Sequence, residues 1–118
     1  MVTWPYYQVT MVTIDPKAKR RFENRAKVIK ALAHPTRICI VDRLSRGEQC
    51  VRDLTALVCC DMSTVSKHLS ILKNAGIVRD EKRGACVYYT LRIPCILNFF
   101  QCSDAVVESV VREQTAVE

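Results

Sequence analysis

The 118-residue chain has no apolar run near the ~20 residues that a membrane-spanning helix needs, so we expect no membrane span. The opening residues, MVTWPYYQVTMVTIDP, have neither the basic start nor the apolar centre of a secretory signal peptide. Hydrophobic residues make up 49% of the chain, which is typical of a globular protein. We therefore predict an arm at 1–15 and one folded domain at 16–118, in a cytoplasmic protein.

Disulfide bonds are not expected either, although the chain has seven cysteines. Their number is odd, a signal peptide is lacking, and a domain of this size forms a core without covalent bridges. We therefore expect free thiols in a reducing compartment. There, clustered cysteines indicate metal binding, metalloid binding or redox chemistry more than a structural role.

The charge is unbalanced, with 18 Lys and Arg against 12 Asp and Glu, a net charge of +6. Residues 17–30 hold much of the excess, and the segment after Ser103 is acidic. A basic body favours a polyanionic partner such as nucleic acid. Charge alone fits a solvated basic helix equally well.

Periodicity predicts a mostly α-helical chain with one β-hairpin. The expected helices are 16–33, 35–44, 51–58, 63–74 and 95–112, and the hairpin is 77–91 with its turn at 81–84. Two short helices joined by a tight turn and followed by a hairpin form a winged helix-turn-helix, in which the hairpin is the wing.

The helix at 63–74 has one apolar side, made of Met62, Val65, Leu69 and Leu72. Its polar side has no acidic residue, whereas ordinary surface helices usually mix Glu with Lys. Short hydroxyls allow close approach to a DNA groove, and lysine binds bases or phosphates. The DNA contacts that we expect on this helix are Ser63, Thr64, Ser66, Lys67, Ser70 and Lys73. Lys82 and Arg83 at the hairpin tip suit phosphate or minor-groove contact.

Four blocks, ALAHPTRICIVDRL, GEQCVRDL, STVSKHLSILKNAGIV and RGACVYYTL, resemble the ArsR/SmtB family of winged-helix repressors. The resemblance covers about 27–91 in the order and spacing of the family. It implies a homodimer that binds an inverted repeat in double-stranded operator DNA and leaves it when a metal or metalloid binds. The family's S-x-x-S-x-H-L pattern falls on Ser63, Ser66, His68 and Leu69.

Two known effector sites of that family are absent from the sequence, and a third is incomplete. The zinc type needs histidines on the last helix, which has none, and one cadmium and lead type needs cysteines in an arm that has none before Cys39. The arsenic pattern C-V-C-D-L-C corresponds to CVRDLT, which keeps only Cys50.

Cys95 and Cys102 lie on an apolar stripe of the last helix that also predicts a dimer interface. Some arsenic sensors of the family carry thiols at the start of this helix, so we predict As(III) or Sb(III) bound by Cys95 and Cys102. Seven helical residues span ~10.5 Å, too far for one shared ion. Either Pro94 lets Cys95 fold back, or the partner subunit completes the site. The alternative is that both cysteines are only packing residues of the dimer interface.

The remaining thiols are weaker candidates for effector ligands. Cys59 and Cys60 lie in the turn before the helix at 63–74, which we call the reading helix, and are a minor ligand candidate. We expect Cys39 and Cys86 to be small buried hydrophobic residues.

The sequence leaves two other functions open. A thiol redox or persulfide sensor on the same fold needs two cysteines and no metal. An enzyme is disfavoured: Cys86 to Arg92 has the C-x5-R spacing of an arsenate reductase, but the intervening VYYTL lacks glycine and alternates like a strand. We therefore predict no catalytic residues and no catalytic cofactor.

Overall fold

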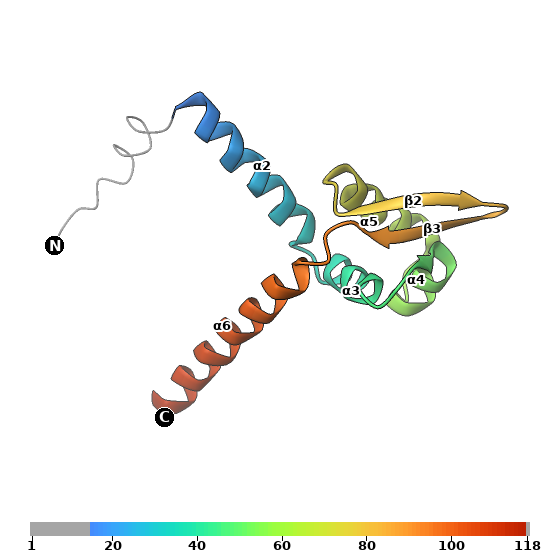
Figure 1. The fold of residues 1–118 in the computed structure, drawn as a ribbon. Helices are drawn as coiled ribbons and strands as arrows, with labels where there is room; N and C mark the ends of the chain where they lie inside the picture. The colour runs from blue at the N-terminus through green and yellow to red at the C-terminus, as the bar shows by residue number, and fades with distance from the viewer. Residues whose placement is uncertain (1–14, 118) are drawn as a thin grey trace.

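The computed structural model describes residues 15–117, so the arm predicted at 1–15 lies almost wholly outside the described residues. The fold is a mostly helical winged helix-turn-helix with a small antiparallel sheet, as predicted (Figure 1). The elements, in order, are α2 (Pro16–Leu32), α3 (Pro35–Leu44), β1 (Gln49–Cys50), α4 (Val51–Val58), α5 (Met62–Asn74), β2 (Val78–Arg83), β3 (Cys86–Leu91) and α6 (Ile96–Val117).

Side chains before the first turn cap α2 and α3. Asp15 Oδ1 accepts a hydrogen bond of 2.8 Å from the Ala18 amide, and His34 Nδ1 accepts one of 3.1 Å from the Thr36 amide. Each helix begins with a proline, whose missing N–H would have no helical partner at that position. Capping and proline together explain why the chain breaks between α2 and α3.

The core lies where α3, α4 and α5 meet the start of the hairpin. Val65, Leu69 and Leu72 of α5 are fully buried, as the apolar pattern predicts. Met62 was predicted beside them but is 53% exposed, because α5 begins at this residue, at the margin of the core. The buried side of α5 leaves its polar side in solvent.

The wing is the hairpin of β2, β3 and their connecting turn. Glu81, Lys82 and Arg83 were predicted in the turn but extend β2, where they pair with Tyr88, Val87 and Cys86. The connection is only Gly84-Ala85, and Gly84 has the positive φ of +62° that so tight a turn requires. The charged residues stay in the strand because their side chains are solvated at the edge of the sheet.

A third strand, β1, was not predicted. It pairs with β3 and gives the order β1-β3-β2, with Gln49 opposite Tyr89. Two residues are too short to show an alternating pattern in the sequence. This strand attaches the wing to the start of α4.

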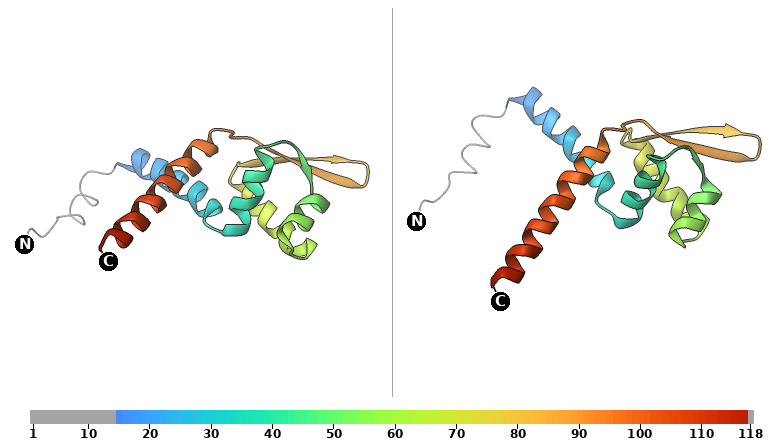
Figure 2. Two further views of the ribbon diagram at one scale, coloured as in Figure 1. Left: turned by 90° about the horizontal axis from the view of Figure 1, so that it is seen from below. Right: turned by 60° about the horizontal axis from the view of Figure 1, so that its bottom comes forward.

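Helices α2 and α6 extend away from this body in diverging directions (Figures 1 and 2). The side of α2 that carries Phe22 and Ile29 does not face the core: Phe22 is 49% exposed and Ile29 53%, whereas Ala31 and Leu32 are buried. On α6, which runs five residues past the predicted end at Arg112, Val106 is 63% exposed. Both helices thus keep an apolar side that this protomer does not cover.

Among the helices at residues 15–117, none has both the length and the hydrophobicity for crossing a membrane.

Candidate nucleic-acid interface

The residues predicted to contact DNA on α5 lie on its solvent side. Ser63, Ser66, Lys67 and Ser70 are exposed, and Thr64 is half-buried near the start of the helix. Since Val65, Leu69 and Leu72 anchor the opposite side in the core, the polar side has a fixed orientation. This helix therefore presents hydroxyl and ammonium groups on a rigid support.

An acidic residue, Asp61, occupies the N-cap position of this helix. The Ser63 hydroxyl donates a 2.6 Å hydrogen bond to Asp61 Oδ2. Hydrogen bonds from Ser63 and then Thr64 lower the pKa of Asp61, so this carboxylate stays charged. A negative group at a helix N-terminus also complements the helix dipole. The Ser63 hydroxyl is thus occupied by a hydrogen bond within the protein. Ser66 and Lys67 are therefore better candidates for DNA contact.

The four predicted cations differ in their partners. Within residues 15–117, Lys67 and Lys82 form no ion pair. Lys73 Nζ lies 3.0 Å from Asp80 Oδ1, which links α5 to β2. Arg83 binds two carboxylates, and these raise its pKa. Lys67 and Lys82 are therefore the cations most available to a phosphate.

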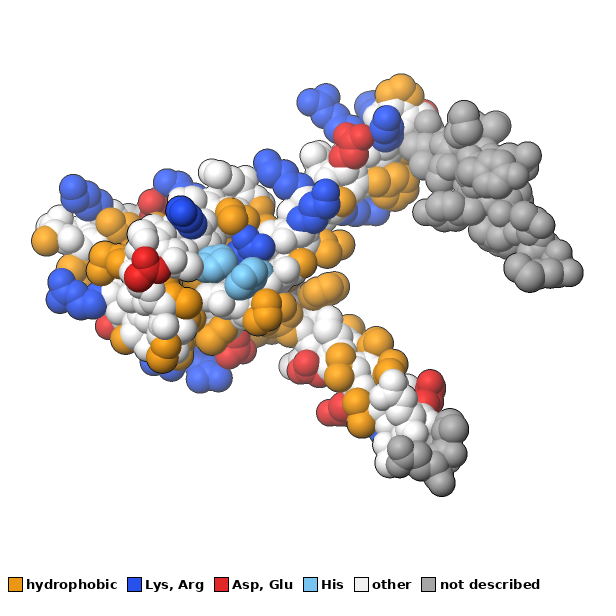
Figure 3. Space-filling view, turned by 180° about the vertical axis from the view of Figure 1, so that it is seen from behind, with side chains coloured by type: hydrophobic (Ala, Val, Ile, Leu, Met, Phe, Trp, Pro, Cys, Tyr) orange, Lys and Arg blue, Asp and Glu red, His pale blue; other side chains and the backbone are white. Residues whose placement is uncertain are grey.

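Two half-buried histidines form a pair between the start of α3 and α5. The rings of His34 on the α3 side and His68 on α5 lie 4.5 Å apart and are tilted by 49° (Figure 3). Burial lowers the pKa of His68, and repulsion by His34 and Arg37 lowers it further. His68 Nδ1 and Arg37 Nε are buried without a hydrogen-bond partner among the described residues. His68 therefore packs against His34 as a neutral group.

The two thiols predicted to bind a metalloid are both exposed. Cys95 lies in the turn before α6, and its carbonyl accepts a 3.1 Å hydrogen bond from the Asn98 amide. Cys95 thus precedes the first residue of α6, whereas Cys102 lies within the helix. Cys95 lines a hollow against Arg25 and Ile29 of α2, which Cys102 does not reach.

One protomer does not assemble a complete metal site in the part of the chain that the structure describes. No group of three or more His, Cys, Asp or Glu side chains there converges to hold an ion. The donor type fits a soft ion, because Cys95 and Cys102 offer exposed sulfur. The number of donors does not, because these two thiols do not form a complete site within one protomer.

The other cysteines are dispersed. Cys50 Sγ donates a 3.0 Å hydrogen bond to Asp53 Oδ2. Cys59 is exposed and has the positive φ of 54°, whereas the adjacent Cys60 packs against the core. Cys86 is half-buried. The minor candidate pair in the turn before α5 is therefore split between solvent and core.

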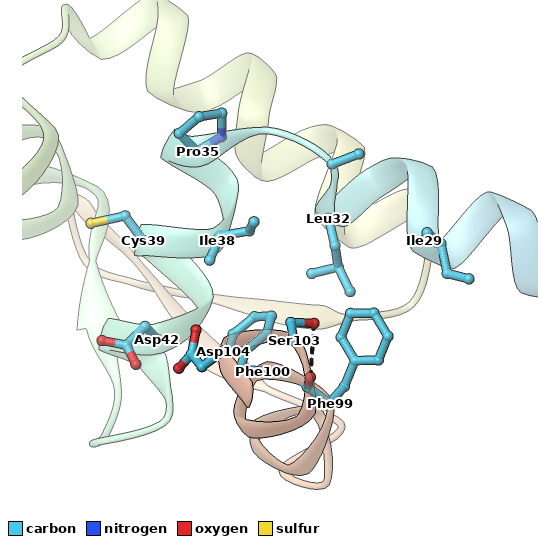
Figure 4. Close-up of a pocket in the computed structure, with 11 residues that line it drawn as sticks. Ile29, Leu32, Pro35, Ile38, Cys39, Asp42, Phe99, Phe100, Ser103 and Asp104 are labelled. Carbon is cyan, nitrogen blue, oxygen red and sulfur yellow. Dashed lines mark hydrogen bonds between the residues drawn. The ribbon is translucent and has the colours of Figure 1, made fainter. Parts of the chain in front are cut away.

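Cys39 was predicted to be buried but is exposed, because α3 packs into the core through Ile40, Val41 and Leu44. It lines a hollow of about 740 Å³ between α3, the end of α2 and the start of α6 (Figure 4). The lining is mostly apolar and includes Leu32, Ile38, Phe99 and Phe100.

Comparison with known proteins agrees with this architecture. Residues 34–80 match the family described as "Bacterial regulatory protein, arsR family". A cadmium resistance transcriptional regulatory protein CadC homologue of Staphylococcus aureus is 44% identical over 75 residues, which are 63% of this chain and 62% of that protein. A transcriptional repressor SmtB homologue of Synechocystis is 32% identical over 94 residues, 80% of this chain and 71% of that one. The chain thus spans less than two thirds of the CadC homologue.

Among solved structures, the homodimeric winged helix-turn-helix DNA-binding domain Mb0332 of Mycobacterium bovis superposes with a TM-score of 0.72 at 24% identity. The superposition covers 86% of this chain and 94% of that one, and it confirms the fold.

The fold and the exposed side of α5 define a winged helix-turn-helix regulator. The chain belongs to the ArsR/SmtB family of transcriptional regulators. The family is regulatory, which confirms that the chain is not an enzyme. The C-x5-R segment agrees, since Cys86–Leu91 is the extended strand β3 and its amides pair with other strands instead of enclosing an anion.

The lowered pKa of the half-buried His68 predicts a pH dependence of stability. Its pKa in the folded protein lies below the value of ~6.5 in an unfolded chain, so the unfolded state binds more protons as the pH falls through that range. His68 therefore contributes full stability above pH ~6.5 and loses it on acidification. His68→Gln should show a smaller fall in the urea midpoint between pH 7.5 and 5.5 than the parent. An equal fall in both proteins would contradict this.

Proposed function

We propose that this protein is a homodimeric transcriptional repressor that binds an inverted repeat in double-stranded DNA through α5 and the wing. The observation that carries the proposal is the exposed side of α5, where Ser66, Lys67 and Ser70 stand on a helix anchored by its buried side. Such a helix fits the major groove, which admits an α-helix and displays a distinct pattern for each base pair.

The uncovered apolar sides of α2 and α6 support the dimer. Phe22, Ile29, Val106 and Val110 are all exposed in one protomer, and a second copy related by a two-fold axis would bury them. The homodimeric state of the Mycobacterium bovis domain is in line with this. A two-fold dimer presents two copies of α5, which must be about 34 Å apart to enter successive major grooves.

The effector proposed is a thiophilic metalloid, As(III) or Sb(III), bound by Cys95 and Cys102 with ligands from both subunits. Sulfur donors select soft ions, and the only described histidines, His34 and His68, pack against each other. Because relatives of this chain are named for cadmium resistance, Cd(II) is the competing effector to test. Oxidation of the same thiols is the second alternative.

A ligand at Cys95 and Cys102 would act on α6, where both thiols adjoin the apolar side. Drawing the two thiol pairs together would change how α6 packs across the dimer and hence the separation of the two α5 helices. A coupling of ~1–3 kcal/mol between effector and DNA corresponds to a 5–150-fold loss of affinity.

Reversing the charge of Lys67 tests the reading helix. Lys67→Glu should lower affinity by about 100-fold or more, because it places a carboxylate against phosphate or a base edge. Affinity is measured by fluorescence anisotropy on a duplex selected from random sequence with the parent protein. Lys19→Glu, exposed at the end of α2 remote from α5, is the matched control. Parent-like binding by Lys67→Glu would exclude α5 as the reading helix.

The wing lysine should behave as a phosphate contact. Lys82→Ala should weaken binding to selected and unselected duplexes alike and reduce the slope of log K against log salt by about one per subunit. A loss restricted to the selected duplex would instead indicate a base contact.

The thiols of Cys95, before α6, and of Cys102, within it, should control release from DNA. Cys95→Ser and Cys102→Ser should bind the selected duplex as the parent does but no longer leave it when As(III) is added. Cys86→Ser, a half-buried thiol of the wing, should respond like the parent.

Parallel titrations with Sb(III), Cd(II), Zn(II) and peroxide identify the effector. If both α6 variants are released by As(III) as readily as the parent, these thiols fill the interface and do not bind the effector. Release by peroxide alone, with an intersubunit disulfide, would favour the redox alternative.

A further inference from the structure

Arg83 is the most extensively bound side chain of the wing. Its Nη1 lies 2.6 Å from Glu48 Oε1 and its Nη2 lies 2.8 Å from Glu48 Oε2, a bidentate pair. Nη2 also lies 3.0 Å from Glu81 Oε2, and the guanidinium carbon is 4.9 Å from the centre of the Tyr88 ring. Two carboxylates and an aromatic face thus contact one cation, whose side chain is 48% exposed.

The strand register produces this cluster. Side chains alternate along β2, so Glu81 and Arg83 share one side of the wing, and Glu81 lies directly opposite Tyr88 of β3. Glu48 immediately precedes β1, and β3 lies between β1 and β2. The guanidinium therefore reaches across the middle strand, over Tyr88, to the chain that leads into α4.

Lys82 has the opposite orientation although it is the next residue along the chain. By the same alternation it shares its side with Asp80, whose carboxylate binds Lys73 of α5. One side of β2 is therefore joined to the reading helix, and the other side is joined to the segment before α4.

The charges of the cluster disfavour a phosphate as the partner of Arg83. The guanidinium with Glu48 and Glu81 has a net charge of −1, so a phosphate would have to displace a carboxylate that already occupies the planar fork. Such an exchange replaces one charge-assisted pair by another and gains little.

We propose that Arg83 is a positioning residue of the wing, which clamps β2 to Glu48 so that Lys82 is held toward DNA. The clamp itself is a property of the free protein, and its effect on DNA rests on the proposed function. Arginine is needed because lysine, a single point charge, cannot form the bidentate pair and stack on Tyr88 at once.

Hydrogen–deuterium exchange of the free protein tests the clamp. Glu48→Ala and Arg83→Ala should each speed exchange of the β2 and β3 amides about two- to five-fold, since each removes the same brace from local opening. The double variant should exchange no faster than the faster single variant. Lys82→Ala should leave exchange unchanged. Parent-like exchange in both single variants would overturn the proposal.

DNA binding tests the consequence for function. Arg83→Lys keeps the positive charge and Glu48→Ala removes a negative one, yet both should weaken binding about two- to five-fold with the salt slope unchanged. If Arg83→Lys binds as the parent does and Glu48→Ala binds more tightly, Arg83 is a phosphate ligand and the proposal is wrong. If the parent binds no duplex even at low salt, the proposed function fails, and the exchange experiment still decides whether the clamp exists.

Discussion

The burial of one side of α5 is the constraint on which the rest of the structure depends. Val65, Leu69 and Leu72 are completely enclosed by the core, and burying side chains of this size contributes roughly 1.5–3 kcal/mol each. These three residues determine which side of the helix faces solvent. The exposed hydroxyls and Lys67 are therefore functional candidates only because the apolar side leaves the helix a single orientation.

The wing is joined to this helix from two directions. Ile77 and Val78 are buried at the base of the hairpin and continue the core into β2. Beyond them, the ion pair between Lys73 and Asp80 connects the hairpin to α5, and β1 connects β3 to the start of α4. The reading helix and the wing thus form one unit, which a dimer would carry as a rigid piece.

Most of the architecture could be predicted from the sequence, because periodicity reports burial directly. The order of helices, the hairpin and the buried residues of α5 follow from the spacing of apolar residues and from the prolines that begin α2 and α3. Contacts between segments distant in the chain could not be predicted. The pairing of Arg83 with Glu48, 35 residues away, has no local signal, and neither has the two-residue β1.

The cysteines show the same limit on what the sequence can predict. Sequence spacing predicted that one helix cannot bring Cys95 and Cys102 together, and in the structure only Cys95 lines the hollow beside α2. Sequence could not show that Cys39 is exposed beside Phe99, because exposure there depends on the direction in which α6 leaves the body. The assignment of ligands is therefore a question about the assembly and not about the single chain.

The uncovered apolar sides of α2 and α6 have a consequence for how stability depends on protein concentration. A surface that is buried only by a second copy links folding to association, so that stability rises with the logarithm of protein concentration by mass action. Dilution would then act in the same sense as a denaturant. Such a regulator would be less stable at low concentration, because separated protomers expose the hydrophobic surface that is covered in the dimer.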